Sequence, residues 1–178
     1  MSDYLDDEFR QMNEREFEDK LEMKEAVSIN DPIRTLQLQK MVLVERGTTI
    51  EKVIKMLQSN GVACVLVVDN GVLTGIFTER DVIKKLIGTN VDITKEIVDD
   101  YMTPNPDTLR MDDPIAFALN RMYDGGYRHV PIVDADNHPV AIVSVLDIIS
   151  HLAVYYSDEV LNLPPNPARK AQKRREGG

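Results

Sequence analysis

The sequence predicts an α+β fold in which two β-α-β-β-α repeats pack together as a pseudo-twofold pair. Three observations predict it. The stretch that begins at Gly61 recurs from Gly126, and the same spacing relates Val44 to Leu109 upstream. Each copy has apolar residues at helical spacing, and each then has two runs rich in Val and Ile joined by a polar turn. One copy alone would hardly bury its strands, so we expect the two copies to share a core.

The first copy, placed at residues 31–90, begins with an extended segment at Val42–Val44 and a helix. That helix has Thr48 or Thr49 as its N-cap and stops at Asn60–Gly61. Two apolar runs around the turn Asp69–Gly71 predict a hairpin whose strands are covered on both faces. A second helix is expected at Thr78–Ile87. The apolar positions of the first helix recur at helical spacing: Ile50, Val53, Ile54 and Leu57.

The second copy, placed with its linker at residues 91–157, has the same order of elements. The linker Gly88–Asp100 is expected to hold a short helix around Lys95–Tyr101. Pro114 suits the first turn of the helix that follows. We expect an extended segment at Thr108–Leu109, a helix from Asp112–Pro114 to Gly125–Gly126, a hairpin turn at Asp134–Asn137 and a helix at Ser144–Tyr155.

The two ends of the chain differ in charge from the repeats. Residues 1–26 carry ten acids against four bases, so residues 1–30 are interpreted as an acidic arm. Residues 158–178 are expected to be a flexible tail, which carries five bases against one acid from Pro164 on. The tail is either solubilising or in contact with a phosphate or an acidic partner. The arm is either solvated and partner-dependent or a helix with one apolar side, formed by Leu5, Phe9, Met12, Phe17 and Leu21.

Composition excludes several classes of protein. The net charge of -9 argues against a general nucleic-acid binder, which needs a basic face. A single cysteine, Cys64, excludes an intrachain disulfide and fits a reducing compartment. We find no secretory signal and no apolar run near the roughly 20 residues that span a bilayer, so we expect no membrane contact and a cytoplasmic location.

The order of motifs resembles the CBS-domain family, named after cystathionine β-synthase. Met102-Thr103-Pro104, followed by Asp112-x-Pro114, is similar to the opening of a CBS motif. The stretches Gly126–Asp134, Gly75–Asp81 and Ala141–Asp147 complete the likeness, which covers residues 31–157. Such pairs form a compact unit with two clefts, often occupied by AMP, ADP, ATP or a related adenosyl ligand. Many associate further into a flat dimer, so the resemblance implies a homodimer here.

Each copy has a hydroxyl and an acid at a strand-to-helix junction, Thr78 with Asp81 and Ser144 with Asp147. This pattern is also that of a helix capping box, and the two roles are compatible. A carboxylate in the first helical turn can accept hydrogen bonds from both ribose hydroxyls. The Thr or Ser hydroxyl can face a phosphate at the helix N-terminus. The resemblance implies that these are the ribose and phosphate contacts.

Three basic residues are candidates for the phosphate. The resemblance places Arg128 and His129 at phosphate-binding positions, and an Arg fork matches phosphate oxygens. His129 would add charge when protonated, which makes its contribution depend on pH near neutrality. Arg80 is a further candidate, or else a solvated surface residue. The first copy has Ala63 and Cys64 at the positions of Arg128 and His129, so we expect unequal clefts.

Two further expectations complete the function predicted from the sequence. The backbone at Val42–Leu43 and Pro106–Thr108, including Thr108, should border the adenine. Nothing supports catalysis, because Cys64 lies in an apolar run and the three histidines have no spacing for a metal site. The sequence therefore predicts a non-catalytic sensor of an adenine nucleotide that acts on an effector protein in trans. The alternatives are a structural dimerisation module without ligand and a sensor of S-adenosylmethionine.

Overall fold

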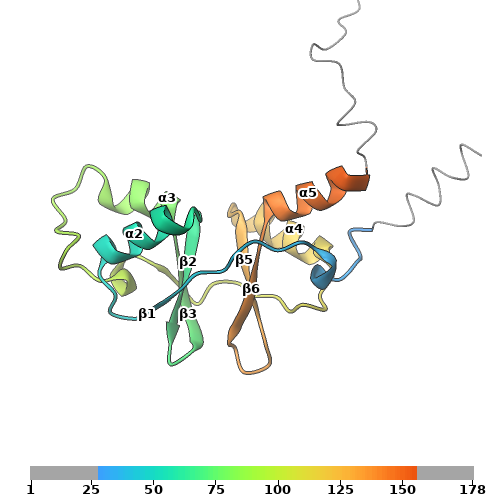
Figure 1. The fold of residues 1–178 in the computed structure, drawn as a ribbon, viewed down its shortest axis with the longest axis horizontal. Coiled ribbons are helices and arrows are strands. Elements are labelled where there is room, and N and C mark those ends of the chain that lie inside the picture. The colour runs from blue at the N-terminus through green and yellow to red at the C-terminus, as the bar shows by residue number, and fades with distance from the viewer. Residues whose placement is uncertain (1–27, 156–178) are drawn as a thin grey trace, which may run out of the picture.

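A computed structural model describes residues 28–155 of the chain (Figure 1). The helix weighed for the N-terminal arm and the flexible tail both concern residues outside this range. The described part is an α+β fold of two similar halves that lie side by side, which confirms the predicted fold class (Figure 1). Within it, no helix combines the length and the apolar character needed to cross a membrane.

The helices and hairpins follow the predicted order in both halves, but the segment Thr108–Leu109 forms an isolated bridge in place of a strand. The first half contains β1 (Leu43–Glu45), α2 (Ile50–Asn60), β2 (Cys64–Asp69), β3 (Val72–Thr78), α3 (Glu79–Asp81) and a π-helical continuation of α3 at Val82–Leu86. The second half contains β4 (Thr103–Pro104), α4 (Ile115–Gly125), β5 (His129–Val133), β6 (Pro139–Ser144) and α5 (Val145–Tyr155). Two short 3-10 helices, Ile33–Thr35 and Val98–Asp100, precede the halves.

Helices α2 and α4 end where glycine permits a left-handed backbone. Gly61 has a φ of 63° and Gly126 a φ of 64°, a conformation that costs other L-residues energy. At the start of α2, Thr49 is the N-cap residue, but its side chain makes no capping bond. Pro114 differs from the expectation, because it lies before α4 as the N-cap residue with a ψ of 142°, instead of in the first turn.

The larger sheet has the order β1-β2-β3-β4, with β1 parallel to β2 and the other pairs antiparallel. The sequence did not predict β4, whose Pro104 suits an edge strand because it has no N–H to donate. A Cβ on Gly75 would lie 2.2 Å from Sδ of Met102, so the Met102 side chain occupies the space that this glycine leaves. In the other half, β5 and β6 form an antiparallel pair, and Leu109 bridges to Ile132 beside them.

Each half completes its core with a short segment that lies outside it in the sequence. Val98 is fully buried in the first half, and its backbone N–H donates to the Thr48 carbonyl at 2.9 Å. Ile33 is fully buried in the second half, and its backbone N–H donates to the Asp113 carbonyl at 2.9 Å. The two bonds are equivalent under the repeat. The halves therefore interlock and do not only touch.

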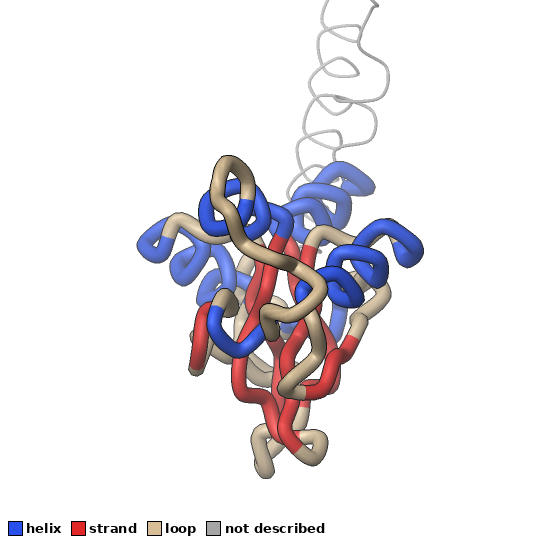
Figure 2. The backbone as a smooth tube through the Cα atoms, turned by 90° about the vertical axis from the view of Figure 1, so that its left-hand side faces the viewer, coloured by secondary structure: helices blue, strands red, loops and turns tan. Residues whose placement is uncertain are grey.

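A third apolar cluster lies between the halves, where the two hairpins face each other (Figure 2). At the hairpin ends, Leu73 and Asn137 exchange two hydrogen bonds of 3.0 and 3.1 Å. This cluster covers the second face of the strands, so their nearly continuous runs of Val and Ile are buried on both sides. It consists of Cys64, Leu66, Leu73, Ile76, Val133 and Ile142.

Candidate functional site

A cleft of about 320 Å³ lies between the two halves. The first half contributes Ala63, Ile76 and the junction Thr78–Asp81 between β3 and α3. The second half contributes β4 with the residues after it and the start of β5. Because β4 pairs with β3, it carries its chain directly into this cleft. The lining from the second half comprises Thr103, Asn105–Asp107 and Tyr127–His129.

The cleft brings together five of the residues selected from the sequence: Thr78, Arg80, Asp81, Arg128 and His129. Ser144 and Asp147 are not in its lining and are only 5% and 4% exposed. Thr108 is also outside the lining, although Pro106 and Asp107 beside it belong to it.

Sequence reasoning did not select the side chains of Glu79, Asp107 and Tyr127, although the stretch Pro106–Thr108, expected to border the adenine, contains Asp107. The sequence could have indicated Glu79 and Tyr127, because they are next to the selected residues Arg80 and Arg128, respectively. The backbone around Asp107 was expected beside the ligand, but the role of its side chain was not, because the pairing of β4 with β3 and the bridge from Leu109 to Ile132 place it there.

Thr78 and Asp81 form a complete capping box at the start of α3. Asp81 Oδ2 accepts from the Thr78 backbone N–H at 2.9 Å and from the Thr78 hydroxyl at 2.8 Å. Its other oxygen, Oδ1, lies 2.8 Å from Nζ of Lys85, one turn along. Lys85 also donates to the Tyr101 carbonyl at 2.5 Å. A ribose hydroxyl would therefore share Oδ1 with Lys85.

Ser144 and Asp147 make the two backbone bonds of a capping box at the start of α5, and the hydroxyl-to-carboxylate bond of Thr78 is not among them. Asp147 Oδ2 accepts from the Ser144 N–H at 2.7 Å, and the Asp147 N–H donates to the Ser144 hydroxyl at 3.2 Å. Both residues are buried. The capping geometry is thus common to the two repeats, whether or not a ligand is bound.

The basic residues of the cleft differ in how they are engaged. Arg80 donates from Nη1 to the Gly126 carbonyl at 2.6 Å and so joins the two halves. The Arg128 guanidinium is exposed and has no hydrogen-bond or ion-pair partner within residues 28–155. Burial, and then the charge of Arg128, hold the pKa of His129 below its ordinary 6.5, against the opposing charges of Asp147 and Glu79. His129 is therefore neutral at pH 7, and Arg128 is the cation available to an anion.

Asp107 and Tyr127 form a hydrogen-bonded pair on the cleft wall. The Tyr127 hydroxyl donates to the Asp107 carboxylate at 2.7 Å, and Arg121 lies 3.9 Å from the other carboxylate oxygen. Burial and then this hydrogen bond raise the pKa of Tyr127 to about 12, so the phenol keeps its proton. The Tyr127 ring packs over Gly125, where a Cβ would meet a ring carbon at 2.0 Å.

The charges of this cleft have no equivalents on the other side of the pseudo-twofold axis. The hydroxyl and acid of the capping box recur there, but each remaining charged position is apolar. Cys64, for example, is buried, and burial followed by the charge of Glu79 raises its pKa to about 12. The correspondences are Glu79 with Val145, Arg80 with Leu146, Asp107 with Val42, Arg128 with Ala63 and His129 with Cys64.

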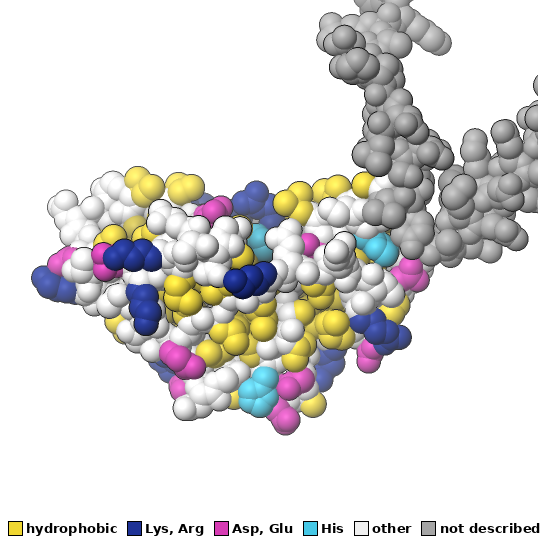
Figure 3. Space-filling model, viewed as in Figure 1, with side chains coloured by type: hydrophobic (Ala, Val, Ile, Leu, Met, Phe, Trp, Pro, Cys, Tyr) yellow, Lys and Arg dark blue, Asp and Glu magenta, His cyan; other side chains and the backbone are white. Residues whose placement is uncertain are grey.

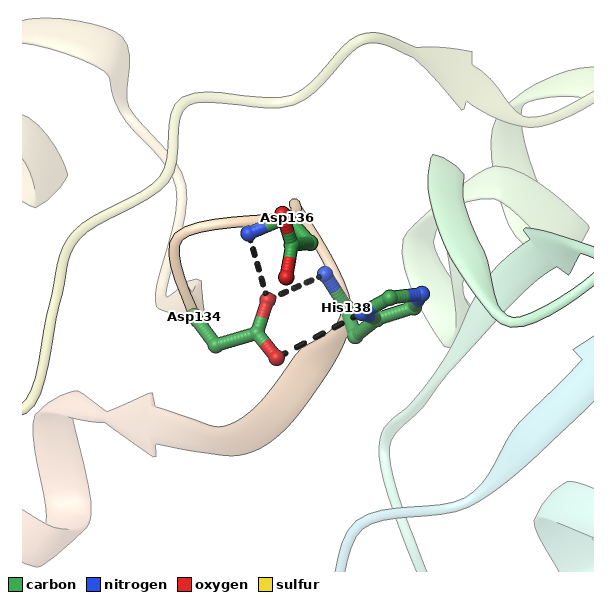
Figure 4. Close-up of side chains that lie close together, drawn as sticks. All are labelled: Asp134, Asp136 and His138. Carbon is green, nitrogen blue, oxygen red and sulfur yellow. Dashed lines mark hydrogen bonds and ion pairs between the residues drawn. The ribbon is translucent and has the colours of Figure 1, made fainter.

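A second polar cluster lies at the β5–β6 turn, where Asp134, Asp136 and His138 offer ligand atoms within 4.8 Å of one another (Figure 4). All three side chains are exposed. Asp134 Oδ1 accepts from the backbone N–H groups of Asp136 and His138, both at 2.9 Å. These bonds, led by the one from His138, lower the pKa of Asp134 and close the turn. The cluster is thus explained by the hairpin.

Comparison with protein families gives one match. The family model described as CBS domain matches this chain twice, at residues 33–88 and 98–154. The first match begins with the 3-10 helix that packs in the second half, and the second with the 3-10 helix that packs in the first half. The two matches cover more than half of the chain.

Two similar proteins are known by name, and the first carries the same description. The CBS domain-containing protein CBSCBSPB1 of Arabidopsis thaliana is 31% identical over 115 residues, which are 65% of this chain and 21% of that protein. The meiotically up-regulated gene 70 protein of Schizosaccharomyces pombe is 34% identical over 111 residues, 62% of this chain and 15% of that protein. The chain therefore spans about a fifth or less of these two relatives.

A solved structure has the same fold. It is the CBS domain pair of protein MJ0100 in complex with 5′-methylthioadenosine and S-adenosyl-L-methionine. The TM-score is 0.60 at 26% identity, and the match covers 68% of this chain and 98% of that chain.

Proposed function

The chain belongs to the CBS-domain family, and from that premise we propose that it senses an adenine nucleotide in the cleft between its repeats. CBS domain pairs are regulatory modules. One observation supports the ligand most: the charged side chains gather in one cleft, while the equivalent positions across the axis are apolar. If these charged residues only stabilised the fold of the repeats, the two sides would not need to differ in charge, because the capping boxes are present on both sides.

In this proposal the nucleotide uses three parts of the cleft. The Asp81 carboxylate accepts from the ribose hydroxyls through Oδ1, which it shares with Lys85. Arg128 binds the phosphate, because its guanidinium fork is exposed and has no other partner among the described residues. Arg80 and the Thr78 hydroxyl assist it. The apolar walls, Ala63, Ile76 and Pro106, are suited to the adenine ring.

We further propose one ligand for each chain. Ser144 and Asp147, selected from the sequence as ligand contacts, then act as a structural cap, because they are buried and bonded to each other. On this side the positions that carry Arg128 and His129 in the first cleft are Ala63 and Cys64, which offer no charge to a phosphate. Thr108 then supports the chain next to Asp107 without touching the ligand.

A sensor of S-adenosylmethionine is the second candidate. It is favoured by the ligands of the MJ0100 domain pair and by Glu79 and Asp107 in the cleft, since carboxylates attract the ammonium group of that ligand. We place the nucleotide first, because Arg128 and Arg80 provide two guanidinium groups for a phosphate.

The signal would pass to an effector protein in trans through the assembled module, which we propose is a homodimer. Apolar side chains lie along the helical edge in two groups, over α3 and over α5, with charged side chains between them (Figure 3). They include Ile83, 64% exposed, and its repeat equivalent Ile149, 53% exposed. An apolar patch that obeys the internal pseudo-symmetry suits a second copy of the chain.

Calorimetric titration of the ligand-free chain with AMP, ADP, ATP and S-adenosylmethionine tests the proposal. We expect one site for a nucleotide, and a loss of about 10-fold to 100-fold in affinity in Arg128→Gln, since a hydrogen bond to a charged group contributes about 1.5–3 kcal/mol. Arg110→Gln is the matched control, because Arg110 is an exposed arginine outside the cleft. If no adenosyl compound bound, the dimerisation module without ligand would replace the sensor.

A further inference from the structure

We propose that Glu79 and Asp107 limit the ligand to one phosphate group, so that the cleft prefers a nucleoside monophosphate to the diphosphate and triphosphate. This inference rests on the proposed function. It concerns two residues that neither the repeat nor the capping pattern selected, and it narrows the ligand within the nucleotide class.

Glu79 is a carboxylate with no side-chain partner within residues 28–155. It lies between two residues proposed for the ligand, Thr78 at the end of β3 and Arg80 on α3. Its backbone N–H donates to the Ala63 carbonyl at 3.0 Å, which holds this end of α3 against the cleft floor. Its charge acts on His129 and on Cys64, both from neighbouring strands. Glu79 is therefore an exposed negative charge, on a hydrogen-bonded backbone, close to the Arg128–His129 side of the cleft.

Asp107 is a second carboxylate, contributed by the opposite half of the molecule. The Tyr127 hydroxyl holds it at 2.7 Å, and Tyr127 immediately precedes Arg128. Because that phenol keeps its proton, it remains a donor, and its acceptor remains oriented. Arg121 lies 3.9 Å away with both side chains about half exposed, so it offsets little of the charge of Asp107.

The positive charges of the cleft are sufficient for one phosphate. Arg128 is unengaged among the described residues, and Arg80 has only a backbone carbonyl as partner. Lys85 is already paired with Asp81. A dianionic phosphate would therefore meet two guanidinium groups. While His129 is neutral, a second or third phosphate would find no further cation in the lining and would approach two carboxylates, and juxtaposed like charges oppose binding.

The other side of the pseudo-twofold axis strengthens this inference. There Glu79 is replaced by Val145 and Asp107 by Val42. Neither carboxylate is thus required for the repeat fold, since the fold forms equally well with valine at these positions. Both acids lie on the side of the axis that carries Arg80 and Arg128, whereas the other side has a lysine, Lys40, only at the position of Asn105. This arrangement is expected if both signs of charge act on the same ligand.

The test is a titration of the full chain with AMP, ADP, ATP and S-adenosylmethionine, in the absence of divalent cations. The chains compared are the wild type, Glu79→Gln, Asp107→Asn and Tyr127→Phe. We expect the wild type to bind AMP at least about tenfold more tightly than ATP, a difference of about 1.4 kcal/mol. Glu79→Gln and Asp107→Asn should each tighten ATP severalfold more than AMP. Tyr127→Phe should do so to a smaller degree, because it frees Asp107 without removing its charge.

The matched control is Glu51→Gln, which removes a carboxylate from α2 outside the cleft and should leave the ratio of affinities unchanged. Equal affinities for AMP and ATP in the wild type would overturn the inference and leave the sensor function standing. Equal changes for every nucleotide in the variants would do the same, as would tighter binding of S-adenosylmethionine than of AMP. If none of these ligands bound, the proposed function itself would fail, and this inference with it.

Discussion

The Arg80 guanidinium donates to the Gly126 carbonyl across the boundary between the two repeats, at 2.6 Å. Arg80 also lines the ligand cleft, and Gly126 is the residue at which α4 ends. The Arg80 side chain thus lines the ligand cleft and is also hydrogen-bonded to the second repeat. A ligand phosphate that binds Arg80 must compete with that carbonyl, so occupancy of the cleft and the contact between the repeats are coupled.

Because Arg80 is already engaged, it should contribute less to affinity than Arg128. We expect Arg80→Gln to weaken nucleotide binding by less than about tenfold, below the loss in Arg128→Gln. The measurement is calorimetric titration of both variants with AMP. A larger loss in Arg80→Gln would show that Arg80 is the principal phosphate contact.

Variants of the two capping acids, Asp81 and Asp147, should distinguish a role in stability from a role in ligand binding. Asp147→Ala should lower the free energy of unfolding by about 1–3 kcal/mol, because it leaves the buried Ser144 N–H without its acceptor, and nucleotide affinity should be unchanged. Asp81→Ala should abolish most of the affinity and affect stability less, since Asp81 is only partly buried. Urea denaturation and titration of each variant give both quantities. Loss of affinity in Asp147→Ala would place a ligand at the second cleft.

His129 should make the empty protein less stable as the pH falls. Its pKa is lower in the folded chain than the ordinary 6.5, so below about pH 6.5 the unfolded chain binds the proton first. This contribution to stability is present above that pH and is lost as the pH falls towards the folded pKa. Urea denaturation at pH 7.5 and 5.5 should show a smaller loss in His129→Gln than in the wild type. Identical losses would contradict a buried neutral histidine.

Nucleotide binding should reverse this effect at the same residue. A phosphate next to His129 favours the charged imidazole, so binding should raise its pKa and take up protons near pH 6. Titrations in two buffers of different ionisation enthalpy measure the number of protons. We expect uptake in the wild type and much less in His129→Gln, and release of protons would contradict the arrangement.

Cys64 should be unreactive while the protein is folded. Burial, and then the charge of Glu79, raise its pKa to about 12, so almost none of the thiol is ionised at pH 8. Reaction of Cys64 with a thiol reagent should be slow in buffer. It should be immediate in urea, and this reaction of the unfolded chain is the control. Rapid reaction of the native chain would show that the cluster between the hairpins opens readily.

We expect the exposed isoleucines of the helical edge to form the interface of the dimer. We expect a dimer by light scattering, and a monomer when Ile83 and Ile149 are both changed to glutamate, because charge on an apolar interface opposes its burial. Val140→Glu is the control, since Val140 is an exposed apolar residue on β6. A wild-type monomer would contradict the dimer.

The sequence by itself determined the fold class, the family and most of the elements. The repeat is visible because local patterns specify it: helical spacing before Gly61 and Gly126, and Val- and Ile-rich runs around polar turns. The five residues that meet in the cleft were also selected from the sequence, because each lies in or beside a local motif. Their role as ligand contacts stays a prediction.

Only the tertiary structure decided how the repeats exchange their short segments. Strand β4 pairs with β3, and Val98 and Ile33 each fill the core of the other half, through backbone bonds between residues far apart in the chain. No local pattern specifies a partner at that distance, because a short strand or one turn of 3-10 helix gains its stability from what it packs against. Within the second repeat, the bonds between Leu109 and β5 likewise place Asp107 beside Tyr127, a contact that no local pattern specifies.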